Sequence, residues 1–516
     1  MPWYLVLLSI MGTQASAITF LSAPGQAYTD GMRFVQYYFG LPLAMIIICI
    51  VFVPIFRKLK VYTAYEFLEE RFDIKTRTFT SFLFQVSRGL STGISIYAPS
   101  LILSSLLGWN IYWTNIIMGG LLIIYTVSGG ARAVAYTQKL QLIIIIIGMA
   151  IAGYMVVHLM PANIGFADAL QIGGKNGKMN VITNGMTDKG FDWKDKYNLW
   201  SGLIGGLFLA LSYFGTDQSQ VGRYLTAKDN KESKLGLLIN GIVKVPMQFL
   251  ILMIGVLVFS FYQYNKAPIY FNNTQIEAAK NTGKKDSLIN LEKQYAFIAN
   301  GNNSGNAQQE IADIKKQYKA VLKRALPGED VNDTNYIFLR FVIDYLPKGL
   351  IGLLIAVIFL AAWGSIAAAL NALASCTVVD IHKKFINKEL TPKMDYRISK
   401  LYTLCWGIFC IAVAQFASNL GNSLIETVNI LGSLFYGVIL GIFLVAFWIK
   451  QIKGNSVFYA AILSELLVIA IYKADIISFL WLNVIGAGLV IVTGIIFQII
   501  FAAGGYRKIK TPSHNK

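Results

Sequence analysis

Small and hydroxyl-bearing residues interrupt the first apolar stretch of the chain, between Ser9 and Tyr28 (SIMGTQASAITFLSAPGQAY). A simple membrane anchor would consist mainly of Leu, Ile, Val and Phe, because lipid favours apolar surface and penalises unsatisfied polar groups. A helix that unwinds in mid-membrane would explain this composition, since freed carbonyls can bind a desolvated cation while nearby hydroxyls and amides bind a solute. Close helix packing through small residues is the alternative explanation.

The amino-acid composition indicates which class of protein contains this stretch. Of 516 residues, 55% are hydrophobic and 14% are charged, and the mean hydropathy is +0.55. So few charged residues cannot cover the surface of a soluble globule. The net charge of +18 does not indicate nucleic acid as a partner, because the basic residues lie mainly in short connections between apolar segments. We therefore predict an all-α polytopic protein whose environment is the lipid bilayer.

Twelve apolar segments are long enough to cross a bilayer, which takes about 20 residues each. Basic residues follow the even-numbered segments, for example around Arg57 and between Lys383 and Lys400. By the positive-inside rule these connections face the cytoplasm, and Met1 and the C-terminus are expected there too, on the inner side of the plasma membrane. The predicted spans are 3–23, 34–55, 78–106, 111–128, 138–160, 199–216, 237–262, 346–373, 401–419, 424–448, 456–473 and 476–502.

Two connections on the opposite side are long. Residues 161–198 are rich in Gly, Asn, Lys and Asp and are expected to be irregular. Residues 263–345 contain a charge-alternating run, Asn290 to Arg324, that predicts a surface helix or hairpin. This second loop would serve as a lid, a partner surface or a plain insertion, and we favour the insertion. Neither loop has the glycine-rich phosphate loop, paired carboxylates or Ser/His/Asp set of an enzyme, so no enzymatic activity is expected.

Four motifs occur in order on matching spans: SAITFLSAPGQAY, SGGARAVAYTQKLQ, YFGTDQSQVGRYL and AAWGSIAAALNALASCTVVDI. Together they resemble the signatures of the sodium/solute symporter family, over nearly the whole chain. The motifs are most similar to those of the bacterial sialic acid symporters and of the monocarboxylate, vitamin and iodide branch. The resemblance implies secondary active transport, with Na⁺ as the coupling ion, a small-molecule solute as the other partner, and a monomer sufficient for transport.

The resemblance also implies a fold, in which two five-helix repeats are inverted in the membrane in the LeuT/APC manner and two further helices follow. Family members usually carry one more peripheral helix before this core. Because the sequence begins where the first core helix normally starts, that leading helix is expected to be missing. The expected divisions are 1–160 (first repeat), 161–198 (external loop), 199–450 (second repeat with insertion 263–345), 451–502 (two additional helices) and 503–516 (cytoplasmic tail).

The family's shared sodium site combines backbone carbonyls of the first core helix and span eight with two adjacent hydroxyls of span eight. Matching the motifs assigns the carbonyls to Gly12, Ala15 and Ala361. The two hydroxyl positions fall on Gly364 and Ser365. Glycine removes one of the oxygen ligands that a hard cation prefers, so water or a carbonyl would have to replace it. Bonding of the serine hydroxyl back to its own helix is the alternative.

A second sodium site in some members needs an aspartate after a Trp-Thr pair between spans four and five. Here Tyr136 and Thr137 are followed by Gln138. A neutral amide supplies no charge, so we predict one sodium ion per transport cycle. Proton coupling is not expected, because no Asp, Glu or His is evident at mid-membrane in the core spans.

For the solute, the resemblance implies a pocket between several core helices, closed on the inside by an aromatic gate of Tyr213 and Phe214. A known sugar-binding pattern, with a carboxylate on the second helix and an asparagine before the gate, is absent, since Tyr38 and Ala210 occupy those positions. Hexose transport is therefore doubtful. The matching pocket residues are Gln14, Ser16, Thr19, Tyr37, Tyr38, Arg88 and Asn429.

Arg88 lies deep in span three, where a charged side chain is costly unless paired. No acidic residue in the spans is an evident partner, so we expect a solute carboxylate to bind it; bonds to carbonyls of an unwound helix are the alternative. Lys244 of span seven would face a cytoplasmic vestibule or the solute, and we favour the vestibule. Asp217 and Arg223 are expected to be structural, paired with each other or with helix ends.

These features together predict a sodium-coupled symporter that imports a small organic solute. An anion such as sialic acid or a monocarboxylate is favoured by the arginine of span three. The alternatives are a sodium symporter for a neutral solute, such as a sugar, polyol or amino acid, and a sodium-responsive membrane sensor that does not transport.

Overall fold

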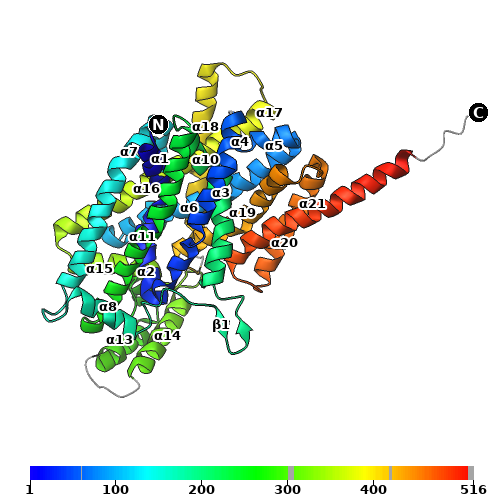
Figure 1. Ribbon diagram of the computed structural model, residues 1–516. Coiled ribbons are helices and arrows are strands. Elements are labelled where there is room, and N and C mark those ends of the chain that lie inside the picture. Colours follow the sequence, from blue (N-terminus) through cyan, green and yellow to red (C-terminus); the bar gives the residue numbers. More distant parts are fainter. Residues whose placement is uncertain (60, 300–306, 418–420, 510–516) are drawn as a thin grey trace, which may run out of the picture.

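The computed structural model describes the backbone of residues 1–59, 61–299, 307–417 and 421–509, and the side chains of all of these except 130–137, 139, 307, 308 and 504–509. Helices make up most of the described chain (Figure 1). The strands β1 (Met186–Thr187) and β2 (Gly190–Phe191) form one short antiparallel hairpin. The predicted all-α class is therefore confirmed.

Apolar helices correspond to all of the predicted spans. Ten described stretches are long and apolar enough to cross a membrane, and two shorter ones, Trp3–Gln14 and Ser201–Gly215, belong to spans one and six. Spans four and five, expected as separate helices, lie on the single helix α7, whose apolar parts are Ile111–Gly129 and Leu140–His158. The elements of the spans are α1 (Trp3–Gln14), α2 (Ala17–Asp30), η1 (Gly31–Tyr38), α3 (Leu41–Ile50), α4 (Phe52–Leu59), α6 (Ile74–Leu107), α7 (Ile111–His158), η2 (Ser201–Gly205), α9 (Gly206–Gly215), α11 (Asn230–Tyr264), α16 (Lys348–Cys376), α18 (Pro392–Phe416), α19 (Leu424–Trp448), α20 (Gly454–Lys473) and α21 (Phe479–Ile509).

Two of these spans are broken. α1 ends at Gln14 and α2 begins at Ala17, because Ala15 (φ −77°, ψ 74°) and Ser16 (φ −84°, ψ 169°) leave the helical conformation. The sixth span breaks after α9, and the chain continues as α10 (Gln218–Leu225). The unwinding expected for the first apolar stretch is therefore confirmed. The broken helices are the first of each predicted repeat, as expected for ion and solute sites at mid-membrane.

The connections gather at two opposite ends of the molecule (Figure 1). The N-terminus lies at one end with α4, α5 (Glu66–Arg71), α10 and α17 (Lys383–Phe385), which follows η4 (Thr377–His382). These are the connections with the basic residues. The other end carries α8 (Phe166–Lys175), the β1–β2 hairpin, α13 (Lys285–Ala299) and α14 (Ala307–Ala325).

Both long connections are more ordered than a plain irregular loop. The expectation that 161–198 is irregular is wrong in part, because it holds α8 and the β-hairpin. In the second connection α12 (Asn273–Lys280), α13 and α14 confirm the predicted surface hairpin. These three helices bury a small apolar core of their own, which includes Ile276, Leu288, Leu291, Tyr318 and Leu322.

The chain after this hairpin, including η3 (Thr334–Tyr336), packs onto the membrane core before α15 (Ile337–Tyr345). A Cβ built on Gly25 of α2 would lie only 2.0 Å from the carbonyl oxygen of Thr334, so glycine permits this close contact. Asn335 Oδ1 accepts the N–H of Leu424 (3.1 Å) at the start of α19. The external connection therefore contacts both α2 and α19, two helices that line the site described next.

Candidate ion and solute site

The break in the first span frees backbone oxygens. In an uninterrupted helix the carbonyl of Gly12 would accept the N–H of Ser16, four residues further on. The carbonyl of Ala15 would likewise accept the N–H of Thr19. Instead, Ser16 N donates to Gln14 O (2.9 Å) and Thr19 N donates to Ser16 O (3.0 Å). The two carbonyls assigned from the sequence as sodium ligands therefore lose their helical partners at this break.

Ser365 lies on α16, which packs against α1. Its hydroxyl donates to Ala361 O (2.9 Å) and lies 3.2 Å from Ala362 O. The alternative considered from the sequence, in which the serine hydroxyl bonds to its own helix, is therefore observed. It is compatible with a ligand role, because a hydroxyl that donates its proton keeps lone pairs that can bind a cation.

Amide side chains of α7 lie close to position 364, the other hydroxyl position that the resemblance implies. A Cβ built on Gly364 would lie 2.5 Å from Gln141 Oε1 and 3.3 Å from Gln138 Cγ. Both glutamines project from α7. The glycine in this motif therefore accommodates amide side chains of a neighbouring helix.

Gln138 joins three helices through its carboxamide. Its Nε2 donates to Gly364 O (3.1 Å) on α16 and to Thr13 Oγ1 (3.4 Å) on α1. Its Oε1 accepts from Ser9 Oγ (3.2 Å). A neutral amide thus directs its donors at the Gly364 carbonyl and the Thr13 hydroxyl, so both oxygens are already engaged by Gln138. The side chains of residues 136 and 137, the rest of the predicted second-site motif, lie outside the described part of the chain.

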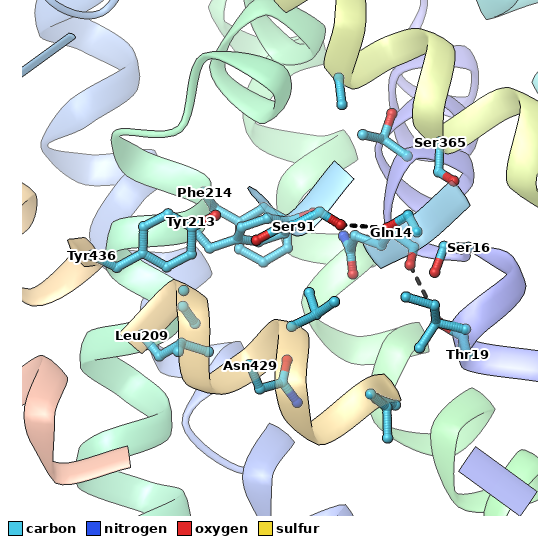
Figure 2. A pocket seen from close by; sticks show the side chains of 18 of the residues that line it. Gln14, Ser16, Thr19, Ser91, Leu209, Tyr213, Phe214, Ser365, Asn429 and Tyr436 are labelled. Carbon is cyan, nitrogen blue, oxygen red and sulfur yellow. Dashed lines mark hydrogen bonds between the residues drawn. The ribbon is translucent and has the colours of Figure 1, made fainter. Parts of the chain in front are cut away.

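A cavity of about 160 Å³ lies beside the break in the first span. In Figure 2, Tyr213, Phe214 and Tyr436 gather on one side of it, while Gln14 and Thr19 lie on the other. Ser365 also reaches this cavity, so the predicted ion and solute residues adjoin. Every side chain predicted to bind solute or form the gate lines it: Gln14, Ser16, Thr19, Tyr37, Tyr38, Arg88, Asn429, Tyr213 and Phe214.

Uncharged polar groups in and beside this cavity are partly paired with one another. Tyr37 Oη donates to Asn429 Oδ1 (3.1 Å), and Gln14 Nε2 donates to Asn240 Oδ1 (3.2 Å). Gln14 also marks the helix break, since its own carbonyl accepts the hydroxyl of Thr19 (3.4 Å). The amide nitrogen of Asn429 is buried without a partner among the described residues, so a solute oxygen could accept its hydrogen bond.

The expectation that Arg88 has no acidic partner is wrong. Its Nη2 pairs with Asp217 Oδ2 and donates to Ser219 Oγ (2.7 Å). The guanidinium also lies over the Tyr213 ring, 5.3 Å from the ring centroid. Arg88 therefore connects α6 to the break in span six, although its Nε has no partner among the described residues.

Asp217 has a structural role, as expected, but the basic side chain that pairs with it is Arg88 and not Arg223. It is the N-cap residue of α10, where its Oδ1 accepts the N–H of Ser219 (2.8 Å). Its Oδ2 accepts from Tyr436 Oη (2.8 Å) on α19 and from Arg88 on α6. The break in span six turns this carboxylate into the interior, which explains the change of partner.

The preference for a cytoplasmic vestibule at Lys244 is also wrong. Its side chain is buried, lines the cavity and places Nζ 5.7 Å from the centroid of the Tyr38 ring. Asn240, one turn earlier on α11, binds Gln14, so this face of the helix turns toward the break in the first span. Among the described side chains, no carboxylate forms an ion pair with Lys244.

Several residues of the cavity were not identified from the sequence. Ser91 and Ser95 line it, and they follow Arg88 at helical spacing, which was a usable signal. Tyr436 lines it as well and binds Asp217, but no local pattern on α19 indicates this.

The family model described as the sodium:solute symporter family matches residues 1–294 and 315–464. The sodium/sialic acid symporter SiaT of Proteus mirabilis (strain HI4320) is 26% identical over 511 residues, 97% of this chain and 88% of that protein. The sodium/iodide cotransporter of Homo sapiens is 26% identical over 454 residues, 87% of this chain. This chain spans 60% of the length of that cotransporter.

A solved structure of a Na⁺-coupled sialic acid symporter, in a substrate-bound outward-open state, is similar with a TM-score of 0.75. It is 24% identical in sequence, and the match covers 97% of this chain and 90% of that one. This likeness confirms the predicted inverted-repeat fold. Because the family model matches most of the sequence, this chain belongs to the sodium:solute symporter family.

Proposed function

We propose that this protein is a secondary active transporter that imports a small organic anion, a sialic acid or a monocarboxylate, together with one sodium ion. Relatives named as sodium/sialic acid and sodium-coupled monocarboxylate symporters support this proposal. It acts from the plasma membrane as a monomer, with Met1 and the C-terminus in the cytoplasm.

The charge balance of the cavity carries the assignment to an anion. The two basic side chains Arg88 and Lys244 both line the cavity. The charge of Arg88 is balanced by its ion pair with Asp217. One buried positive charge therefore remains without a protein counter-ion among the described residues, and it resides on Lys244. A buried unpaired ammonium is costly, so a solute carboxylate that pairs with it gains binding free energy.

The sodium ion is assigned to the break in the first span. The carbonyls of Gly12, Ala15 and Ala361 and the hydroxyl of Ser365 offer oxygen ligands, which suit a hard cation. Bound there, sodium would fasten α1 to α16 next to Gln14 and Ser16, so it favours the conformation that binds solute.

Coupling then follows from the different affinities of each ligand for the outward-open and inward-open conformations. Solute binding permits occlusion, and a rotation of the Tyr213 and Phe214 rings opens the passage to the cytoplasm. Inward opening separates α1 from α16 and releases the ion. One sodium per cycle is proposed because Gln138 contributes no negative charge. One sodium ion carried with one monovalent anion moves no net charge, so the sodium gradient alone drives this import.

The test is sodium-driven uptake by proteoliposomes containing wild-type protein or Lys244→Met. A panel of sialic acid, pyruvate, pantothenate, proline, glucose and myo-inositol separates carboxylates from neutral solutes. We expect Lys244→Met to abolish carboxylate uptake, and Lys231→Met, an exposed lysine on the same helix, to leave it intact. Wild-type uptake of a carboxylate by Lys244→Met would contradict the anion assignment. Uptake of glucose or myo-inositol alone would favour a neutral solute.

A further inference from the structure

We propose that the carboxamide oxygen of Gln141 supplies the sodium ligand that Gly364 lacks. The inference rests on the proposed sodium site and adds a ligand from a helix, α7, that the site did not include. The observation is steric: a Cβ built on Gly364 would meet Gln141 Oε1 at 2.5 Å. The amide oxygen thus occupies the space that a hydroxymethyl side chain at position 364 would fill.

A glutamine amide oxygen can replace a serine hydroxyl as a sodium ligand without changing the charge of the site. A serine hydroxyl and a glutamine carbonyl are both uncharged oxygen ligands, and hard cations bind amide oxygens as readily as hydroxyls in protein sites. The replacement would keep the number of ligands and the net charge of the site. A water molecule, in contrast, would have to be held in a space that the glutamine already fills.

The oxygen of Gln141 is also free to bind. The residue is 7% exposed, and its carboxamide makes no hydrogen bond to any side chain or backbone group that the structure describes. Its neighbour Gln138 is the opposite case, since its amide is engaged by Ser9, Thr13 and Gly364. Of the two glutamines beside Gly364, the one with an unused acceptor points at the missing ligand position.

The two positions should therefore depend on each other. Glycine at 364 makes room for the amide, and the amide replaces the hydroxyl. Gln141→Ala opens space for a side chain, so Gly364→Ser combined with it should restore an oxygen ligand.

The experiment measures the sodium concentration that gives half of the sodium-induced rise in Tm of the purified full-length protein, with no solute present. Gln141→Met, which keeps the length and loses the oxygen, should raise this concentration about tenfold or more. Gln141→Glu keeps an oxygen and should not raise it. The double variant Gln141→Ala/Gly364→Ser should return most of the way to wild type. Asn115→Ala, a buried amide at the other end of α7, is the control and should leave the sodium dependence unchanged.

Ser365→Ala separates this inference from the proposed site. If Ser365→Ala weakens the sodium response and Gln141→Met does not, the role of Gln141 is overturned while the site stands. If neither changes the response, the sodium site itself is misplaced. If Gln141→Met weakens the response but the double variant is no better than Gln141→Ala, the glutamine acts through packing and the inference is also overturned.

Discussion

Replacing Arg88 with methionine should destabilise the protein, whatever solute it carries. Arg88 pairs with Asp217, and the exposed fractions of the two side chains are 12% and 0%. Removing the guanidinium would leave that carboxylate buried without a cation at the start of α10. The hydrogen bonds from Ser219 and Tyr436 would remain.

The expected cost follows from this burial. Removing one partner of a buried ion pair typically costs about 3–5 kcal/mol. Because Asp217 keeps its hydrogen bonds, we expect the lower end, about 3 kcal/mol for Arg88→Met. Asp217→Asn should cost a similar amount, since it leaves the arginine unpaired. The double variant has neither charge, so its loss should be smaller than the sum of the single losses by about 2 kcal/mol.

The assay is reversible denaturant unfolding in mixed micelles for the four proteins of this double-mutant cycle, with sodium-driven uptake measured in parallel. Arg88→Met should lower stability and reduce uptake of every solute that the wild-type protein transports to a similar degree. Wild-type stability combined with a selective loss of carboxylate uptake would refute this reasoning. It would show instead that Arg88 binds the solute and that its contact with Asp217 contributes little.

Three further outcomes are expected. Gly202→Val should reduce the amount of folded protein in the membrane, because a Cβ at this position would lie 2.0 Å from Gln36 O. The control Gly488→Val should leave it unchanged, because a Cβ there would have no atom within 4 Å. Fluorescence size-exclusion chromatography measures both. Asp380→Asn should lower stability by about 3 kcal/mol, since this buried carboxylate accepts two bonds from Arg77 (2.6 and 2.9 Å); wild-type unfolding would contradict this. Exchange of sodium for choline should lower the Tm of the wild-type protein, and an unchanged Tm would indicate that no sodium binds in the absence of solute.

The features that could be predicted from the sequence are those that local composition determines. Stretches of apolar residues predict the spans, because lipid requires them. Ala15 and Ser16 lie in a stretch whose small and polar residues are unusual for lipid contact, and the helix breaks there. The hairpin of α13 and α14 follows from alternating charge between Asn290 and Arg324.

The features that could not be predicted depend on which side chains meet across the fold. Arg88 and Asp217 are 129 residues apart, and neither local stretch indicates that the break in span six brings them together. The side of α11 that holds Lys244 faces the cavity because Asn240 contacts α1, a tertiary contact without a local pattern. Gly364 looked like a lost ligand, since only packing places an oxygen of α7 beside it.

The most direct test of sodium-coupled import at the helix break is uptake of labelled sialic acid and pyruvate by proteoliposomes, with sodium high outside or equal on both sides. The proposed mechanism predicts accumulation above equilibrium only with the imposed gradient, and predicts that Ser365→Ala removes it. Equal accumulation with and without a sodium gradient, or unchanged accumulation in Ser365→Ala, would contradict the proposed coupling.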